Sequence, residues 1–503
     1  MDYPSLQLMA SLCLENLPAD ILIQIHKHLD GRDIIILRKT CRKLHAVTQR
    51  RTVWLNAVRR MCRRHGVFTP SFPVEDMSIT ELEHVSLCPS RLSSLIHNEI
   101  PLQSFITRIL EPRTPSNFEG DLYTDAFLIP GGRFLVVNST HHGLCLWDLG
   151  IHGGKAPKFR PVAVIPDVNR VLLCSGPTQD GLGIILISWS TSTSDRTLCA
   201  HEIYPCTNCP QFTLLGSIQY AQQGTRFTVN HKPTLYGDLL VFANSPGHIV
   251  AWNTRLDTAI AWRYHDGHDD QYIYDMLIYE GSVILIQGHK LSVWDIPPLR
   301  LLLSDGYEII DQTYSVRTDG SELNFGNANQ TPRYVIVYSF PSHQELVGSS
   351  VLSPWFSSID PPISFGIFGY KDEECSMLYY TVKSINPSRD PLLPMVFPIK
   401  MGMVPNLFTD TSSSDDINYS KPLQHCDDEL CLTTITNQGI VISLMTPPIL
   451  LDGPSSSKTT VLFSRFGTRA LISWSFCAAS GRLVVVEYSK VIRIMDFLVP
   501  PPS

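Results

Sequence analysis

The chain has 503 residues, 44% of them hydrophobic and 17% charged, and its formal net charge is −7 at pH 7. This ordinary globular composition predicts two or three folded units rather than a disordered chain, and apolar runs of about five residues are too short for a bilayer-spanning helix, which needs roughly 20. The amino terminus lacks a basic signal-peptide front and the 13 cysteines show no disulfide framework, so we expect a cytoplasmic or nuclear protein.

Positive charge is concentrated near the front of the chain. Residues 32–64 contain eleven Lys or Arg and a single acid, Asp33, which gives this stretch a charge of +10 and leaves −17 for the remainder. Such a stretch is suited to binding an acidic protein or nucleic acid, although a solvated helical face would have the same composition.

Residues 1–65 are predicted to form a small all-α unit of three short helices. Leu17-Pro18 precedes the first helix, and proline is favoured in the first turn of a helix. Apolar residues then recur at helical spacing. They are Ile21, Leu22, Ile25 and Leu29 in the first helix, Ile34, Leu37, Cys41 and Leu44 in the second, and Val53, Trp54 and Val58 in a third that covers residues 48–63. Because about 45 residues bury little apolar surface, we expect a partner to complete this core.

The next segment, residues 66–116, is predicted to be a helical and Pro-rich linker. Ser78 and Glu81 have the spacing of a capping box, in which each side chain accepts a backbone N–H of the other residue. Pro101, Pro112 and Pro115 mark the end of the segment. We interpret it as a spacer rather than as part of a core.

Residues 117–503 have the pattern of an all-β domain. Short runs of β-branched and aromatic residues alternate with Gly, Pro, Asn, Asp and Ser turns. Several runs end in Trp followed by Asp or Asn: Leu144–Asp148, Ile249–Asn253, Leu291–Asp295 and, with Met in place of Trp, Ile492–Asp496. Trp252 and Trp294 are 42 residues apart, as are Trp147 and Trp189. A period of about 40–45 residues with this ending indicates propeller blades.

We therefore predict a WD-repeat-like β-propeller of about six to eight blades, with seven giving the best fit to the length of the domain. The register of the blades between residues 300 and 465 is not evident from the sequence. A pair of two-sheet sandwiches is the alternative fold. We expect Trp147, Trp252 and Trp294 to be structural blade residues rather than platforms for a ligand.

Two groups of residues have a composition that suits metal binding. Cys206 and Cys209 have the spacing of half a zinc site, with Cys426 and Cys431 as a remote complement, but no second half of the same form follows. The stretch Tyr264–Gln271 contains two His and three Asp, and its Asp-Gly pair favours a polar turn. The chain has no hydrolase nucleophile elbow, kinase signature or zincin motif. We therefore predict no metal site, no cofactor and no catalytic residue.

In the order and spacing of its residues, segment 17–54 resembles the F-box, the helical module that docks substrate receptors onto cullin-type ubiquitin ligases. Leu17-Pro18 match the opening Leu-Pro of that family, and Val53-Trp54 match its closing pair. One departure is His26, where the family more often has Phe. The resemblance implies that an adaptor protein binds a set of residues in this segment. The set contains Leu17, Pro18, Ile21, Leu22, Ile25, Leu29, Ile34, Leu37, Arg38, Cys41, Leu44 and Trp54.

The same resemblance implies a non-catalytic substrate receptor of an SCF-type (cullin–RING) ubiquitin ligase. Its F-box would dock on a Skp-family adaptor, and through it on cullin and RING subunits, by a helix-in-groove contact, while the propeller would hold an unknown target protein. The layout, with its spacer residues Met77–Glu83 and Pro89–Leu92, is also similar to F-box proteins of mushroom-forming fungi. Propeller loops vary freely in sequence, so we nominate no target-binding residue.

Three other functions are compatible with the sequence. The F-box-like front could belong to a binding scaffold that no longer engages a ligase, and His26 favours that alternative. A metal-dependent propeller enzyme would use the cluster at His265–Asp270. Nucleic-acid binding by the basic front would leave the apolar stripe and Leu17-Pro18 without a role, so we expect neither nucleic acid nor a membrane as a partner.

Overall fold

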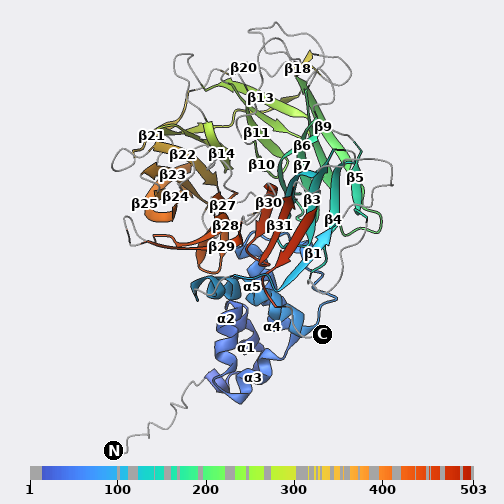
Figure 1. The fold of residues 1–503 in the computed structure, drawn as a ribbon, viewed down its shortest axis with the longest axis vertical. Coiled ribbons are helices and arrows are strands. Elements are labelled where there is room, and N and C mark those ends of the chain that lie inside the picture. The colour runs from blue at the N-terminus through green and yellow to red at the C-terminus, as the bar shows by residue number, and fades with distance from the viewer. Residues whose placement is uncertain are drawn as a thin grey trace, which may run out of the picture.

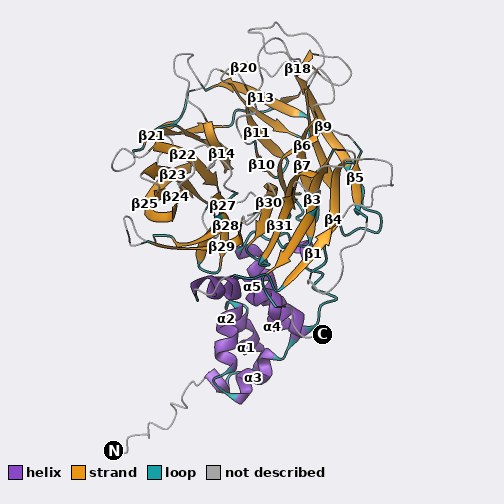
Figure 2. Ribbon diagram, viewed as in Figure 1, coloured by secondary structure: helices purple, strands orange, loops and turns teal. Residues whose placement is uncertain are grey.

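The computed structural model has a helical base, formed by residues 14–98, beneath a ring of β-sheets (Figure 1). Within the described part of the chain there are five α-helices, all before residue 98, and seven sheets (Figure 2). The structure describes residues 14–98, 102–110, 123–140, 142–151, 160–166, 170–190, 196–220, 233–244, 248–264, 273–301, 315–316, 322–323, 327–328, 331–339, 345–351, 355, 363–371, 374–384, 396–409, 421–436, 438–448, 453, 455–464, 471–487 and 491–499.

Four short helices form what we call the helical module. They are α1 (Ala19–His26), α2 (Gly31–Arg38), α3 (Arg42–Thr48) and α4 (Arg51–Arg64), preceded by the 3-10 turn η1 (Leu14–Asn16). The prediction of three helices was wrong, because the second one breaks at Cys41. Thr40 Oγ1 donates to the carbonyl of Leu37 at 2.8 Å where α2 ends. Cys41 is extended, with φ −154° and ψ 162°, and its sulfur accepts the N–H of Leu44. Cys41 therefore caps α3 instead of continuing α2.

The long helix α5 (Ile79–His97) lies between the helical module and the ring, and follows the short 3-10 turn η2 (Thr69–Ser71). It begins with the predicted capping box, in which Ser78 Oγ accepts the N–H of Glu81 at 3.2 Å and the Glu81 carboxylate accepts the N–H of Ser78 at 2.7 Å. Leu82 joins the core of the helical module, whereas Leu92 packs into a cluster within the ring. The interpretation of this segment as a spacer outside any core was wrong.

Each blade of the ring has four antiparallel core strands, and the first six blades each take these strands in chain order. Blade 1 contains β2 (Tyr123–Leu128), β3 (Phe134–Ser139), β4 (Gly143–Asp148) and β5 (Ala163–Ile165). Blade 2 contains β6 (Arg170–Pro177), β7 (Ile184–Ser190), β8 (Arg196–Ile203) and β9 (Thr213–Tyr220). Blade 3 contains β10 (Thr234–Tyr236), β11 (Leu239–Asn244), β12 (His248–Asn253) and β13 (Thr258–Arg263).

The second half of the ring repeats this arrangement. Blade 4 contains β14 (Ile273–Tyr279), β15 (Ser282–Gln287), β16 (Lys290–Asp295) and β21 (Tyr334–Val337). Blade 5 contains β22 (Glu345–Val351), β23 (Ser364–Lys371), β24 (Glu374–Ser384) and β25 (Val396–Thr409). Blade 6 contains β26 (Gln424–Cys426), β27 (Glu429–Thr436), β28 (Gly439–Thr446) and β29 (Ser456–Ser464). Blade 7 contains β30 (Leu471–Cys477), β31 (Arg482–Glu487) and β32 (Ile492–Asp496), and takes its fourth strand from elsewhere. The prediction of a seven-bladed propeller is confirmed.

The ring is closed by β1 (Ile106–Leu110), which pairs antiparallel with β32 as the outer strand of blade 7. An ion network fixes this closure: Asp496 on β32 accepts hydrogen bonds from Arg108 on β1 and from Arg482 on β31. All three side chains are buried. The division of the chain into domains at residues 65 and 116 stays a proposal. The strand β1 belongs to the propeller although it precedes residue 116.

Short strands between β16 and β21 extend two other blades. The strands β17 (Arg300–Leu301) and β20 (Asn327–Ala328) pair with β13 of blade 3, and β18 (Ser315–Val316) pairs with β9 of blade 2 and with β19 (Glu322–Leu323). The chain thus leaves blade 4 after its third strand and returns to add the fourth, β21, only at Tyr334. This insertion explains why the blade repeat was not evident in the sequence after residue 300.

The Trp-Asp endings lie on the third strands of their blades. Trp147, Trp252 and Trp294 are the next-to-last residues of β4, β12 and β16, and each ring is buried, as expected of structural residues. Trp189 lies on β7, the second strand of blade 2, so its spacing from Trp147 does not mark a blade repeat and that reading was wrong.

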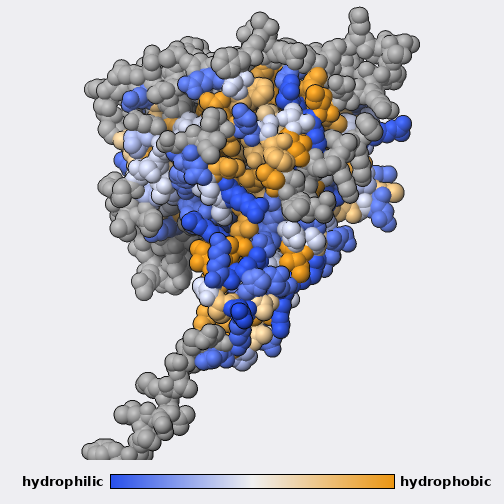
Figure 3. All heavy atoms as spheres, turned by 60° about the horizontal axis from the view of Figure 1, so that its bottom comes forward, coloured by the Kyte–Doolittle hydropathy of each residue, from blue (hydrophilic) through white to orange (hydrophobic). Residues whose placement is uncertain are grey.

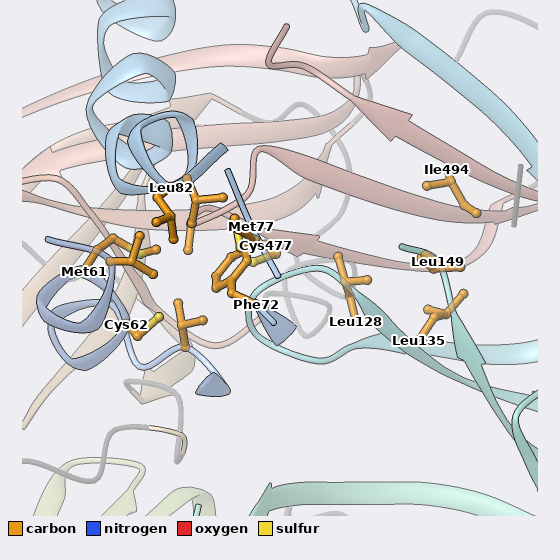
Figure 4. Close-up of a cluster of buried hydrophobic side chains, with 14 of the residues drawn as sticks. Met61, Cys62, Phe72, Met77, Leu82, Leu128, Leu135, Leu149, Cys477 and Ile494 are labelled. Carbon is orange, nitrogen blue, oxygen red and sulfur yellow. The ribbon is translucent and has the colours of Figure 1, made fainter. Parts of the chain in front are cut away.

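One continuous core joins the helical module to the ring. Met61 and Cys62 of α4 and Phe72 after η2 belong to the same buried cluster as Leu128 of β2 and Ile494 of β32 (Figure 4). The helical base and the ring are therefore joined by packed side chains and not by a linker alone. No helix within the described ranges is long and apolar enough to cross a membrane.

Candidate functional site

The twelve predicted docking residues differ in their exposure. Leu22, Ile34, Leu44 and Trp54 are at most 3% exposed and build the core of the helical module. A partner cannot contact side chains that are buried in this way. The others are accessible to different degrees: Pro18 and Ile21 are exposed, and Leu17, Ile25, Leu29, Leu37, Arg38 and Cys41 are half-buried.

Arg38 points into the protein. Its guanidinium donates to both carboxylate oxygens of Glu83 on α5, at 3.1 and 2.7 Å, and its Nε donates to Thr48 Oγ1 at 3.0 Å. It also lies over the ring of Trp54, 5.0 Å from the centroid. The Trp54 indole N–H in turn donates to the carbonyl of Thr48 at 2.8 Å. These bonds tie α2, α3 and α4 to α5, so Arg38 and Trp54 act inside the module.

The accessible apolar surface of the module includes a residue that sequence reasoning missed. Ile36 of α2 is 54% exposed, Ile21 of α1 is 48% exposed and Leu14 of η1 is 37% exposed. Figure 3, in which this end of the molecule comes forward, shows hydrophobic atoms among hydrophilic ones. Ile36 stands in the run Ile34-Ile35-Ile36, and only the helical register distinguishes its outward direction from the inward direction of Ile34. Isolated apolar residues are common on surfaces, whereas a contiguous apolar patch indicates a contact site.

The basic charge of the helical module is partly neutralised within the protein. Arg60 and Arg64 pair with Asp30, and Arg51 donates to the backbone carbonyls of Val74, Glu75 and Met77. Six exposed Lys and Arg side chains form no ion pair with any residue that the structure describes. They are Lys27, Lys39, Arg42, Lys43, Arg59 and Arg63.

His26, the departure from the F-box pattern, is fully buried. Its Nδ1 donates to the carbonyl of Leu22, but Nε2 is buried without a hydrogen-bond partner. A buried polar atom without a partner costs about 1–3 kcal/mol. We expect His26→Phe to raise the free energy of unfolding of the helical module by about 1 kcal/mol, because it removes this atom and fills the space with carbon. Chemical denaturation of both proteins measures the change, and a lower stability of the variant would contradict this account.

The helical module meets blade 6 at two histidines. His65 Nδ1 donates to the carbonyl of His425 at 3.1 Å. Burial lowers the pKa of His65 from 6.5 to about 3, and the neighbouring charges of His425 and Arg64 also lower it. Burial, followed by the charge of Arg64, lowers the pKa of His425 to about 4. Both imidazoles are therefore neutral in the folded protein at neutral pH.

These histidines predict a loss of stability in mild acid. Between pH 6.5 and about 4 the unfolded chain binds protons at both histidines and the folded protein does not, so the free energy of unfolding falls as the pH falls. We expect His65→Gln, which keeps a donor for the carbonyl of His425 but does not titrate, to reduce the loss between pH 6.5 and 5.5 by about 1 kcal/mol. Denaturation at both pH values measures this, and equal slopes for the variant and the wild type would contradict it.

The helices contact one face of the propeller at blades 1, 2 and 6. In a blade of sequential antiparallel strands, the turns after the first and third strands lie on one face. Several contacts of the helical base are with such turns. Phe68 N–H donates to the carbonyl of Pro130 between β2 and β3 at 3.1 Å, and Arg64 pairs with Asp428 between β26 and β27. Cys206 between β8 and β9 donates to the carbonyl of Pro70 at 3.6 Å. The opposite face lies away from the helices.

The two predicted metal-binding groups are placed differently. Cys206 and Cys209 are exposed in a turn of blade 2, whereas Cys426 and Cys431 are buried in blade 6, so the four do not form one site. Residues 265–271 of the His- and Asp-rich stretch lie outside the described residues. Elsewhere, in the parts that the structure describes, no group of three or more His, Cys, Asp or Glu side chains could hold a metal ion.

Comparison with known families identifies the type of domain that the helical module forms. Residues 14–63 match the family model described as F-box-like, and this range spans η1 and α1 to nearly the end of α4. No curated protein matches the chain. The match and the fold together show an F-box-like domain at residues 14–63 and a seven-bladed β-propeller after it.

Proposed function

We propose that this chain is the substrate-recognition subunit of an SCF-type ubiquitin ligase. Its F-box-like domain would bind a Skp-family adaptor, and through it cullin and RING subunits. The observation that carries the proposal is the match of residues 14–63 to the F-box-like family, in a domain whose apolar residues Leu17, Pro18, Ile21 and Ile36 (the apolar group) are accessible. Covering a fully exposed Ile or Leu side chain stabilises a complex by about 1.5–3 kcal/mol.

The unpaired cations support an acidic partner. Lys39, Arg42 and Lys43 lie close in sequence to Ile36 and Leu37, so they would border the apolar contact. Charges at the rim of an interface mainly raise the association rate, and salt screens them. An acidic adaptor would therefore bind more slowly at high salt, with a smaller change in its dissociation rate.

The propeller would hold the target protein on the face that lies away from the helices. Because one core joins the two parts, the target would be held at a fixed distance from the ligase. The chain itself would carry out no bond chemistry, and proximity of the target to the charged conjugate would supply the acceleration. The ligase role places the protein in the cytoplasm or nucleus, with neither nucleic acid nor a membrane as a partner.

A double substitution tests the docking assignment. We expect Leu17→Ala with Pro18→Ala to abolish capture of a purified Skp-family adaptor, because both side chains lie at the accessible start of α1. The melting temperature of the propeller should stay unchanged, since neither residue belongs to a blade. Capture of the adaptor by the double variant at the wild-type level would contradict the docking assignment. Normal folding with no capture by the wild type would favour the scaffold alternative.

A further inference from the structure

Two thiols in the turn between β8 and β9 differ from the other cysteines of the protein. Of the twelve cysteines that the structure describes, Cys206 and Cys209 are exposed, and the other ten are buried or half-buried. Burial raises the pKa of several of those ten, to about 12 at Cys62 and Cys88. Thiols reach oxidants through solvent and react as thiolates, so the buried ones are inert in the folded protein.

The turn brings the two exposed thiols close together in the chain. Only Thr207 and Asn208 separate them, and the backbone bends at both of these residues. Thr207 fixes the start of the turn, where its Oγ1 donates to the carbonyl of Tyr204 at 2.9 Å. A disulfide requires a separation of about 4.4–6.8 Å between Cα atoms, which a bent segment of four residues can provide.

The turn also touches the helical base. Cys206 Sγ donates to the carbonyl of Pro70 in η2 at 3.6 Å, and Arg133 of blade 1 donates to the same carbonyl at 3.3 Å. Burial raises the pKa of the Cys206 thiol, with the Arg133 charge opposing that rise. A change at Cys206 therefore removes one of the two donors to the Pro70 carbonyl.

We propose that Cys206 and Cys209 form a reversible disulfide with a small-molecule disulfide such as oxidised glutathione as the oxidant. The Cys209 thiolate attacks one sulfur of the oxidant, and the oxidant's S–S bond breaks to release one thiolate. Cys206 then loses its proton to solvent and attacks the Cys209 sulfur of the mixed disulfide, which expels the second thiolate. The two protein thiols are oxidised by two electrons, and one glutathione disulfide is reduced to two thiols that take up the two protons.

The order of attack follows from the contacts. Cys206 is engaged with the Pro70 carbonyl, whereas Cys209 makes no hydrogen bond to any other described residue. Closing the disulfide removes the S–H donor of Cys206 and leaves Arg133 as the donor to Pro70. The turn and η2 are thereby less firmly joined in the oxidised protein.

The test uses the full-length folded chain with oxidised glutathione, followed by alkylation of the remaining thiols and peptide mass analysis. We expect an internal Cys206–Cys209 disulfide that dithiothreitol reverses, with the buried cysteines unmodified. Cys206→Ser should instead trap a glutathione adduct at Cys209, and Cys209→Ser should react several-fold more slowly at Cys206. Both sites are exposed, so both variants should fold like the wild type.

Three outcomes would overturn the proposal. They are separate glutathione adducts on both cysteines of the wild type, a disulfide to any other cysteine, and full alkylation of both thiols after oxidation. Amide hydrogen exchange at residues 67–72 is the second readout. It should be faster in the oxidised wild type than in the reduced protein, and unchanged by the same treatment of Cys206→Ser, in which only Cys209 is modified.

Discussion

Replacing Arg482 with Ala is expected to lower the free energy of unfolding of the propeller by about 3–5 kcal/mol, which is the usual cost of breaking a buried ion pair. Arg482 is 2% exposed and pairs with Asp496 through Nε. It also donates to the carbonyls of Gly132 and Gly150 in blade 1, the second at 2.9 Å. The substitution leaves Asp496 with Arg108 as its remaining partner and leaves both carbonyls short of a donor, at the place where the ring closes.

The matched control is Arg333→Ala in blade 4. Arg333 pairs with Asp295, the acid that follows Trp294, but these side chains are 32% and 42% exposed. Exposed pairs contribute about 0–1 kcal/mol. Thermal or chemical unfolding of both variants measures the difference, and equal losses would show that ring closure does not depend on the buried network.

The second large effect is expected at Ile21. Ile21→Asp should weaken binding of a Skp-family adaptor by about 100-fold or more, because it removes apolar contact worth about 1.5–3 kcal/mol and places a charge in the interface. Ile21 is 48% exposed in the chain alone, so the folded protein tolerates the change. Isothermal titration of the purified chain with the adaptor measures the dissociation constant.

A substitution of the same kind elsewhere separates docking from a general effect. Ile109 on β1 is 51% exposed but lies on the outer edge of blade 7, away from the apolar group of the F-box-like domain. Ile109→Asp should leave adaptor affinity within about 2-fold of the wild type. If both variants lose affinity equally, the apolar group around Ile21 is not the docking surface.

The F-box-like domain could be predicted because its signals are local. Leu17-Pro18, the periodic apolar residues and the closing Val53-Trp54 lie within one short stretch. The break at Cys41 was missed, since the spacing of Leu37, Cys41 and Leu44 also fits one continuous helix. The exposure of Ile36 was missed for a related reason: three successive Ile residues show which face is apolar only after the helix register is known.

The propeller was predicted from Trp-Asp endings that lie near the ends of third strands. Its closure could not be predicted, because β1 and β32 are separated by almost the whole ring in sequence and pair only in the folded chain. The strand insertions after β16 pair with blades 2 and 3, so their partners are also distant. The two-sided burial of α5 depends on the ring being formed, and no periodicity within α5 reveals it.

The most direct test of the ligase assignment is whether the folded full-length chain assembles with a purified Skp-family adaptor and cullin. Size-exclusion chromatography with light scattering would measure the mass of the complex. The account predicts one chain per adaptor, with cullin joining only when the adaptor is present. Separate elution of a folded chain and a functional adaptor would contradict it, and would leave the F-box-like domain as part of a binding scaffold.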